Sequence, residues 1–286
     1  MSDAALSMQV EHVRCLSASG FHRMAYVEFL PANASSAPPV ICAHGLTRNG
    51  RDFDRLAAAL SASRRVVSPD IVGRGRSEWL SDAAGYGYPQ YCADMTVLLA
   101  RLGTEQVDWV GTSMGGLIGM MLAAQPNSPI RRLVMNDIGP FVPAAALQRL
   151  GGYVGKDPRF ADLGSLEAYL RQTHAGFGTI DDAGWRHLAL HGHRHLPDGK
   201  LGLVYDPAIG RAFAGVIKDV DLSSIWQRVS CPVLVLRGAE SDLLLAATAR
   251  AVSSKAEVVE VANTGHAPSL MVPEQIEIVR SWLARP

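Results

Sequence analysis

A serine between glycines stands where an apolar strand is followed by an apolar helix. The pentapeptide GTSMG, residues 111–115, matches the pattern G-x-S-x-G; QVDWV before it is typical of a buried strand, and LIGMMLAA after it of a buried helix. The glycines let two backbones pass closely around a sharp turn that exposes the serine oxygen. The pattern predicts Ser113 as a nucleophile; a turn that only allows packing is the alternative.

A serine hydroxyl needs a base, and the base needs a group that orients it. His266, in VANTGHAPSL, follows the last predicted strand, where a loop can reach the same sheet edge. Three residues are candidates for the orienting acid: Asp242 and Glu240 after one strand, and Asp137 at the end of another. We expect Asp242 first, Asp137 next and Glu240 last. The resulting order Ser–Asp–His is the one expected for a triad on this kind of sheet.

Backbone N–H groups for an oxyanion come from two places in the sequence. VICAHGL ends a predicted strand at the same sheet edge, so the N–H groups of Leu46 and Met114 would point at one spot. Two such donors can lower the barrier to acyl transfer by several kcal/mol. An ordinary strand-terminating turn at His44-Gly45 is the alternative.

Strand-like and helix-like segments alternate along most of the chain. Short apolar runs without alternation are typical of a parallel sheet covered on both faces. We expect such strands at 38–45, 106–111, 130–137, 231–238 and 256–263, and a strand followed by a glycine-rich loop within 64–77. Helices are expected at 52–63, 88–103 and 273–284, and an antiparallel hairpin at 11–30. The fold class is therefore α/β, with a mostly parallel eight-stranded sheet flanked by helices.

The alternation stops between residues 139 and 225, where aromatic residues and helix-like pieces occur without a buried strand. We expect core segments at 1–138 and 226–286, with 139–225 inserted as a mainly helical cap. Its aromatic side chains indicate a largely apolar pocket with a few polar groups; they are Phe141, Tyr153, Phe160, Tyr169, Phe177, Trp185 and Phe213.

The motifs HGLTRNG, PDIVGRGRSE, GTSMGG, RGAESD and TGHAP, in that order, resemble the α/β-hydrolase fold superfamily. The resemblance implies Ser113 as nucleophile, His266 as base, Asp242 as acid, the Leu46 and Met114 amides as oxyanion donors, and the cap as a lid. DIVGRGRSE is similar to the family's structural loop D-x-x-G-x-G-x-S, so its matching residues are not assigned to catalysis: Asp70, Gly73, Gly75 and Ser77. The acid loop is one residue longer than in many relatives, which keeps Asp137 and Glu240 open.

Relatives that open epoxides or remove halides carry aspartate where this chain has Ser113. Serine favours acyl transfer, so we expect hydrolysis of small uncharged or weakly acidic carboxylic esters through an acyl-enzyme. Lactone opening and hydrolysis of a C–C bond beside a ketone use the same triad and stay open. A ligand receptor that keeps the triad without turnover is an alternative from another class.

Composition excludes several other functions. Lys plus Arg and Asp plus Glu both total 27, which does not favour a nucleic-acid partner. No apolar run is long enough for a membrane span, and MSDAALSMQV does not resemble a secretory signal. Four widely spaced cysteines indicate a reduced, cytoplasmic protein. A homo-oligomer stays open.

No cofactor is expected either. The glycine-rich stretches fit neither dinucleotide nor P-loop spacing. HGHRH, residues 191–195, offers alternating histidines, but no accompanying carboxylate–histidine set follows it. We interpret it as a solvated or pocket-lining stretch and expect no metal.

Overall fold

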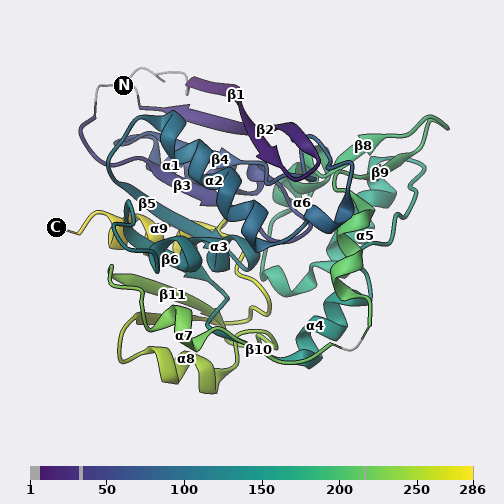
Figure 1. Cartoon of the computed structure of the whole chain (residues 1–286). Coiled ribbons are helices and arrows are strands. Elements are labelled where there is room, and N and C mark those ends of the chain that lie inside the picture. The colour runs from purple at the N-terminus through teal and green to yellow at the C-terminus, as the bar shows by residue number, and fades with distance from the viewer. Residues whose placement is uncertain (1–6, 32–34, 216, 286) are drawn as a thin grey trace, which may run out of the picture.

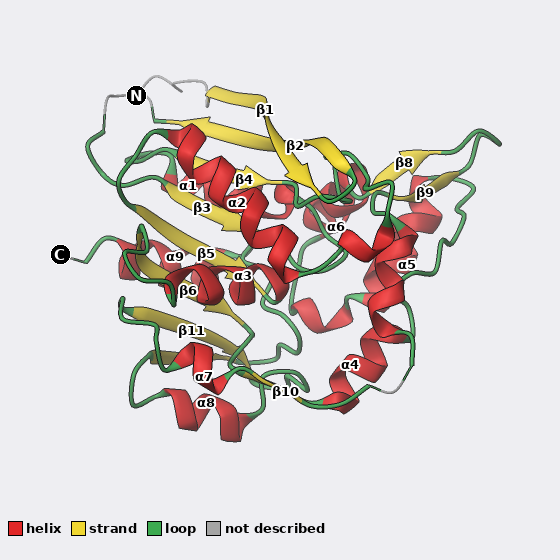
Figure 2. Ribbon diagram, in the orientation of Figure 1, coloured by secondary structure: helices red, strands yellow, loops and turns green. Residues whose placement is uncertain are grey.

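The computed structural model describes residues 7–31, 35–215 and 217–285. Residues 1–6, which bear on the signal-sequence expectation, and part of the expected loop at 32–39 lie outside the described residues. An eight-stranded sheet runs through the molecule with helices on both faces, as Figures 1 and 2 show. The expected fold class is confirmed.

The strand order in this sheet is β1-β2-β4-β3-β5-β6-β11-β12. β1 and β2 form an antiparallel hairpin, β2 pairs antiparallel with β4, and every later pairing is parallel. The strands are β1 (Ser7–Ser17), β2 (Gly20–Leu30), β3 (Val40–Ala43), β4 (Val66–Pro69), β5 (Val107–Thr112), β6 (Ile130–Asn136), β11 (Val233–Gly238) and β12 (Glu257–Val261).

Alternate residues of the central strands enter two separate cores. Val40 and Cys42 of β3 pack with α1 and α9, whereas Ile41 and Ala43 belong to the core that holds α2 and α3. Burial on both faces explains why these strands read as continuous apolar runs. The helices of this part are α1 (Asp54–Leu60), α2 (Tyr88–Leu102), α3 (Met114–Ala123), α8 (Ala246–Val252) and α9 (Pro273–Leu283).

Most of the segment between β6 and β11 lies beside one end of the sheet, whereas its last helix, Ser223–Trp226, lies next to α8 and packs against α3 (Figure 2). In its described residues, no strand joins the large sheet. The segment contains helices, as expected, and two small two-stranded sheets, β7 with β10 and the hairpin β8–β9, were not predicted. The elements are β7 (Phe141–Val142), α4 (Ala144–Gly151), α5 (Leu163–Thr173), α6 (Asp182–His191), β8 (His193–His195), β9 (Leu201–Leu203), β10 (Val220–Asp221) and α7 (Ser223–Trp226).

Across the described ranges, none of the helices has both the length and the apolar character that crossing a bilayer requires.

Candidate active site

Ser113 occupies the turn between β5 and α3 in a backbone conformation that L-residues rarely adopt, with φ 51° and ψ −114°. The flanking glycines are sterically required. A Cβ added to Gly111 would lie 2.3 Å from the carbonyl carbon of Gly115, and a Cβ on Gly115 would lie 2.0 Å from the carbonyl oxygen of Ala43. The turn therefore depends on both glycines, as the sequence predicts.

His266, in the loop between β12 and α9, lies against the serine. Its Nε2 is 2.9 Å from Ser113 Oγ and its Nδ1 is 2.6 Å from Asp137 Oδ2. An ionised carboxylate only accepts hydrogen bonds, so Nδ1 carries the proton and Nε2 accepts from the Ser113 hydroxyl. This arrangement leaves Nε2 ready to take up the hydroxyl proton.

Asp137 directly follows β6, and its side chain is fully buried, with 0% exposed surface. Besides His266, its carboxylate accepts the N–H of Gly238 at 2.7 Å and the hydroxyl of Ser241 at 2.5 Å. These three donors stabilise the charged carboxylate and fix its orientation. Asp137 is therefore held rigidly against the imidazole.

The expected ranking of the acids is corrected by this geometry. Asp242, the first choice, has 49% of its side chain exposed and pairs with Arg149 at 2.5 and 2.8 Å instead of with His266. Glu240 is also exposed. In the loop after β11, Ser241 turns inward to Asp137 while Asp242 turns outward. The second choice, Asp137, orients the histidine, and the order Ser–Asp–His is kept.

Asn136 is a site residue that the sequence reasoning missed. Its side-chain N–H groups donate to Thr112 Oγ1 at 3.0 Å and to the Pro268 carbonyl at 2.8 Å. It thus ties the end of β5, next to the serine, to the loop that carries His266. The dipeptide Asn-Asp at the end of β6 was the signal that could have revealed Asn136 beside the candidate Asp137.

The two expected oxyanion donors both lie at the serine. Leu46 and Met114 line the same cavity as Ser113. Met114 is the first residue of α3, so its N–H has no acceptor within the helix, and the helix dipole favours negative charge there.

His44 fastens the loop that carries Leu46. Its Nδ1 donates to the Gly45 carbonyl at 2.7 Å, and its Nε2 accepts the N–H of Ile71 at 2.9 Å. Burial lowers the pKa of His44 to about 3, so the ring is neutral and suited to these two bonds.

Ser113 opens onto two cavities of different character. The larger, about 510 Å³, is mostly apolar and is lined by side chains such as Leu117, Leu147 and Phe213. The smaller, about 60 Å³, is lined by apolar and polar groups together, and the polar ones include Arg149 and the ion pair of Arg48 with Asp52 at 2.7 Å. The serine thus stands where a large apolar cavity meets a small cavity with a more polar lining.

The inserted segment contacts the histidine loop directly. The N–H of Gly265 donates to the Gly176 carbonyl at 2.8 Å, and a Cβ on Gly176 would lie 3.1 Å from the backbone nitrogen of His266. His174 lines the smaller cavity, and burial lowers its pKa to about 3. This ring is neutral and adds no positive charge to the cavity.

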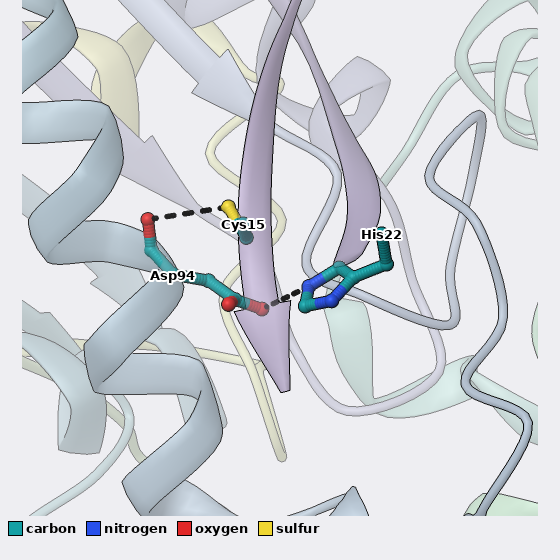
Figure 3. Close-up of side chains that lie close together, drawn as sticks. All are labelled: Cys15, His22 and Asp94. Carbon is teal, nitrogen blue, oxygen red and sulfur yellow. Dashed lines mark hydrogen bonds and ion pairs between the residues drawn. The ribbon is translucent and has the colours of Figure 1, made fainter. Parts of the chain in front are cut away.

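A buried group of metal-ligand type lies away from the serine, at Cys15, His22 and Asp94 (Figure 3). His22 Nε2 is 3.0 Å from Asp94 Oδ2, whose other oxygen accepts from Gln90 at 2.6 Å. Burial, aided by Asp94, raises the pKa of the Cys15 thiol to about 12, which opposes the thiolate that a metal needs.

The imidazole of His22 is held through one nitrogen. Its Nε2 pairs with Asp94, and its Nδ1 has no hydrogen-bond partner among the described residues. We interpret the cluster as a polar fastening of the β1–β2 hairpin to α2.

A second group, Asp54, His187 and His191, includes only one histidine of HGHRH. Its carboxylate already pairs with Arg51 at 2.5 Å, and His187 Nε2 lies 2.9 Å from the Arg51 carbonyl. These ligand atoms are engaged by protein groups, so we assign no metal to the site.

Comparison with known proteins places the chain in a family. The sequence profile of the alpha/beta hydrolase fold matches residues 38–270. The chain is 45% identical over 284 residues to the 3-hydroxybutyrate-oligomer hydrolase of Cupriavidus necator, a match that covers 95% of this chain and 96% of that protein.

Two crystal structures resemble the fold closely. A putative hydrolase from Rickettsia typhi superposes with a TM-score of 0.89 at 34% identity, covering 97% of this chain and 99% of the other. An alpha/beta hydrolase from Novosphingobium aromaticivorans superposes with a TM-score of 0.88 at 33% identity, covering 99% and 100%. This chain therefore belongs to the α/β-hydrolase fold family and is a hydrolase.

Proposed function

We propose that the protein is a serine hydrolase that cleaves small carboxylic esters through an acyl-enzyme intermediate. Ser113 is the nucleophile, His266 the general base and acid, and Asp137 the residue that orients the histidine. The backbone N–H groups of Leu46 and Met114 bind the oxyanion. The observation that carries the proposal is the continuous hydrogen-bonded series from Ser113 Oγ through His266 to Asp137.

In the first half of the reaction, Ser113 Oγ attacks the ester carbonyl carbon while its proton passes to His266 Nε2. Asp137 stabilises the imidazolium, and the two N–H groups stabilise the negative oxygen of the tetrahedral intermediate. When the C–O bond to the alcohol breaks, the alcohol leaves with the proton from His266. The acyl group stays on Ser113.

In the second half, water replaces the alcohol. His266 takes one proton from the water as its oxygen attacks the acyl carbon. Collapse of the second tetrahedral intermediate returns that proton to Ser113 Oγ and releases the carboxylic acid. The enzyme is restored with no cofactor consumed.

The two cavities support a substrate class. A chain of apolar carbon atoms fits the large cavity, and a polar group fits the small cavity, where Arg48 pairs with Asp52 and Arg149 with Asp242. The relative from Cupriavidus necator is named for 3-hydroxybutyrate oligomers. In such a linear oligomer, ester bonds join the units and one end of the chain is a carboxylate. We propose short linear esters of hydroxy acids as substrates, with 139–225 acting as a cap over the site.

Steady-state kinetics on a panel of substrates test this function: p-nitrophenyl butyrate, the linear 3-hydroxybutyrate dimer, a butyrolactone and a 1,3-diketone. We expect the two linear esters to have the highest kcat/KM. Ser113→Ala should lower kcat at least about 10³-fold, whereas the exposed Ser254→Ala should match wild type.

Other outcomes of the panel point elsewhere. Preference for the lactone or the diketone would change the assigned reaction while keeping the nucleophile. Near-full activity of Ser113→Ala would refute the mechanism. Tight binding of the esters without steady-state turnover would favour a receptor.

A further inference from the structure

Arg74 is a buried cation that the proposed reaction does not yet use. It lies in the loop after β4, within PDIVGRGRSE, and its residue has 0% exposed surface. Among the described residues, no carboxylate forms an ion pair with its guanidinium. A buried charge without a counterion is costly, so its retention calls for a reason beyond filling space.

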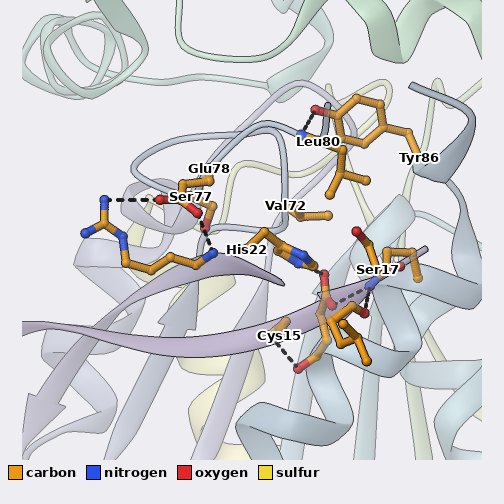
Figure 4. A network of polar contacts seen from close by, with 12 residues as sticks. Cys15, Ser17, His22, Val72, Ser77, Glu78, Leu80 and Tyr86 are labelled. Atoms are coloured by element: carbon orange, nitrogen blue, oxygen red, sulfur yellow. Dashed lines mark hydrogen bonds and ion pairs between the residues drawn. The ribbon is translucent and has the colours of Figure 1, made fainter. Parts of the chain in front are cut away.

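The loop that carries Arg74 is firmly held. The hydroxyl of Ser77 and the carboxylate of Glu78 each accept a backbone N–H from β2 at 2.8 Å. The N–H of Leu80 donates to the Tyr86 hydroxyl at 2.9 Å (Figure 4). Arg74 therefore projects from a rigid support, and its guanidinium can hold other groups in place.

The guanidinium reaches the two residues that supply the proposed oxyanion donors. Its Nε donates to the Leu46 carbonyl at 2.9 Å, and its Nη2 donates to the sulfur of Met114 at 3.6 Å. Its Nη1 donates to the Val72 carbonyl in its own loop at 2.8 Å. One side chain thus bridges the two sides of the oxyanion site.

Aromatic rings rather than anions surround the rest of the charge. The guanidinium carbon lies 4.9 Å from the ring centre of Tyr91 and 5.9 Å from that of Tyr86. Tyr86 in turn donates its hydroxyl to Asp206 at 2.6 Å, so in the described part of the chain this carboxylate is linked to Arg74 through the phenol rather than by an ion pair. Rings attract the cation without cancelling its field, which still acts on nearby developing charge.

We propose that Arg74 is a positioning residue for the oxyanion site. It holds Leu46 and Met114 at the separation that lets both N–H groups bind one oxygen, and its unneutralised charge favours the negative tetrahedral intermediate over the neutral ester. This role rests on the proposed function, because it acts on the oxyanion formed when Ser113 attacks.

The test compares Arg74→Met with Arg74→Lys in p-nitrophenyl butyrate hydrolysis and in inhibition by a trifluoromethyl ketone, which adds to a serine hydroxyl to form a tetrahedral oxyanion. We expect Arg74→Met to lower kcat and ketone affinity in parallel, each about 10- to 100-fold, with KM nearly unchanged. Arg74→Lys keeps the charge but cannot reach both partners, so its parallel losses should be smaller. If the substitution only reduced the fraction of folded protein, kcat would fall in proportion to that fraction and the ketone affinity would not change.

The matched control is Arg64→Met. Arg64 is also buried, and its partner Asp108 keeps a second ion pair with Arg131 at 2.6 Å. We expect its kcat and ketone affinity to stay within about twofold of wild type. Equal losses in Arg64→Met and Arg74→Met would overturn the proposal.

A folded Arg74→Met protein with wild-type kcat and ketone affinity would also overturn the proposal. If the methionine variant does not fold, Arg74→Lys is used instead, and wild-type kcat and ketone affinity in that variant would overturn the proposal. Ser113→Ala is run in parallel. If Ser113→Ala is inactive while the Arg74 variants behave like wild type, only the role of Arg74 is rejected. If Ser113→Ala is fully active, the proposed function is rejected.

Discussion

Replacing Asp137 by asparagine should remove catalysis while leaving the shape of the site intact. The carboxylate receives three hydrogen bonds, from His266 Nδ1–H at 2.6 Å, Gly238 N–H at 2.7 Å and the Ser241 hydroxyl at 2.5 Å. An amide can keep its oxygen on Gly238, but it then presents an NH₂ group where Oδ2 stood. The NH₂ group donates hydrogen bonds, but the His266 Nδ1–H and the Ser241 hydroxyl that face it are donors too.

The site can relieve this conflict in one way that removes the base. If Ser241 rotates its hydroxyl and His266 shifts its proton to Nε2, the amide donates to both, but Nε2 no longer accepts the Ser113 proton. In a triad, such a tautomer change costs about 10⁴ in kcat, equivalent to about 5 kcal/mol at 1.36 kcal/mol per tenfold step. KM should change little, because Asp137 does not line either cavity.

The matched substitution is Asp242→Asn. Its half-exposed carboxylate pairs only with Arg149, so the effect should stay within about fivefold, equivalent to about 1 kcal/mol. The assay is p-nitrophenyl butyrate hydrolysis, with circular dichroism melting to verify that both variants fold. If Asp242→Asn lowered kcat by about 10³-fold or more while Asp137→Asn kept a kcat near that of wild type, the assignment of Asp137 as the orienting acid would be refuted.

Three further results follow from the packing. Gly115→Ala should lower the melting temperature and the activity, because its Cβ would lie 2.0 Å from the Ala43 carbonyl oxygen. Gly164→Ala in α5 should be neutral or stabilising, because its Cβ would lie at an ordinary contact distance of 3.5 Å from Asp162 Oδ1. The pKa of the buried, neutral His44 is about 3 in the folded protein, against 6.5 for a free imidazole, so its contribution to stability is full above pH 6.5 and falls as the pH drops toward 3. His44→Gln should therefore flatten the pH dependence of the free energy of urea unfolding in that window by up to one proton, or about 1.4 kcal/mol per pH unit. An unchanged slope would contradict the burial of His44 as a neutral ring. Leu147→Trp should fill part of the large cavity and lower kcat/KM for octanoyl esters about tenfold more than for acetyl esters; equal losses would place the acyl chain elsewhere.

The sheet could be predicted from local sequence because burial on both faces leaves a local mark. β11 begins with the uninterrupted apolar run VLVL, β6 carries LVM after two arginines, and both strands are buried along nearly their whole length. The glycines around Ser113 were predictable for a similar reason, since a sharp strand-to-helix turn restricts its own neighbours. The two small two-stranded sheets of the inserted segment have strands of two or three residues, which are too short to show a hydrophobic pattern.

The choice of acid could not be made from local sequence because it depends on order across the sheet. β6 lies between β5 and β11, which puts Asp137 beside the nucleophile strand, while Asp242 is separated from it by one more strand. The direction of Asp242 is decided by Arg149, which lies 93 positions earlier in the inserted segment. Likewise, nothing in the loop PDIVGRGRSE shows that Arg74 reaches Met114, a contact that exists only once the chain is folded.

In the proposed reaction, Ser113 becomes acylated during each turnover. Wild-type protein mixed with p-nitrophenyl butyrate, quenched in acid within one turnover and analysed by intact mass and peptide mapping, should carry one butyryl group on Ser113. Ser113→Ala should carry none and should release no burst of nitrophenol. A butyryl group on another residue, or unimpaired turnover by Ser113→Ala, would contradict the account.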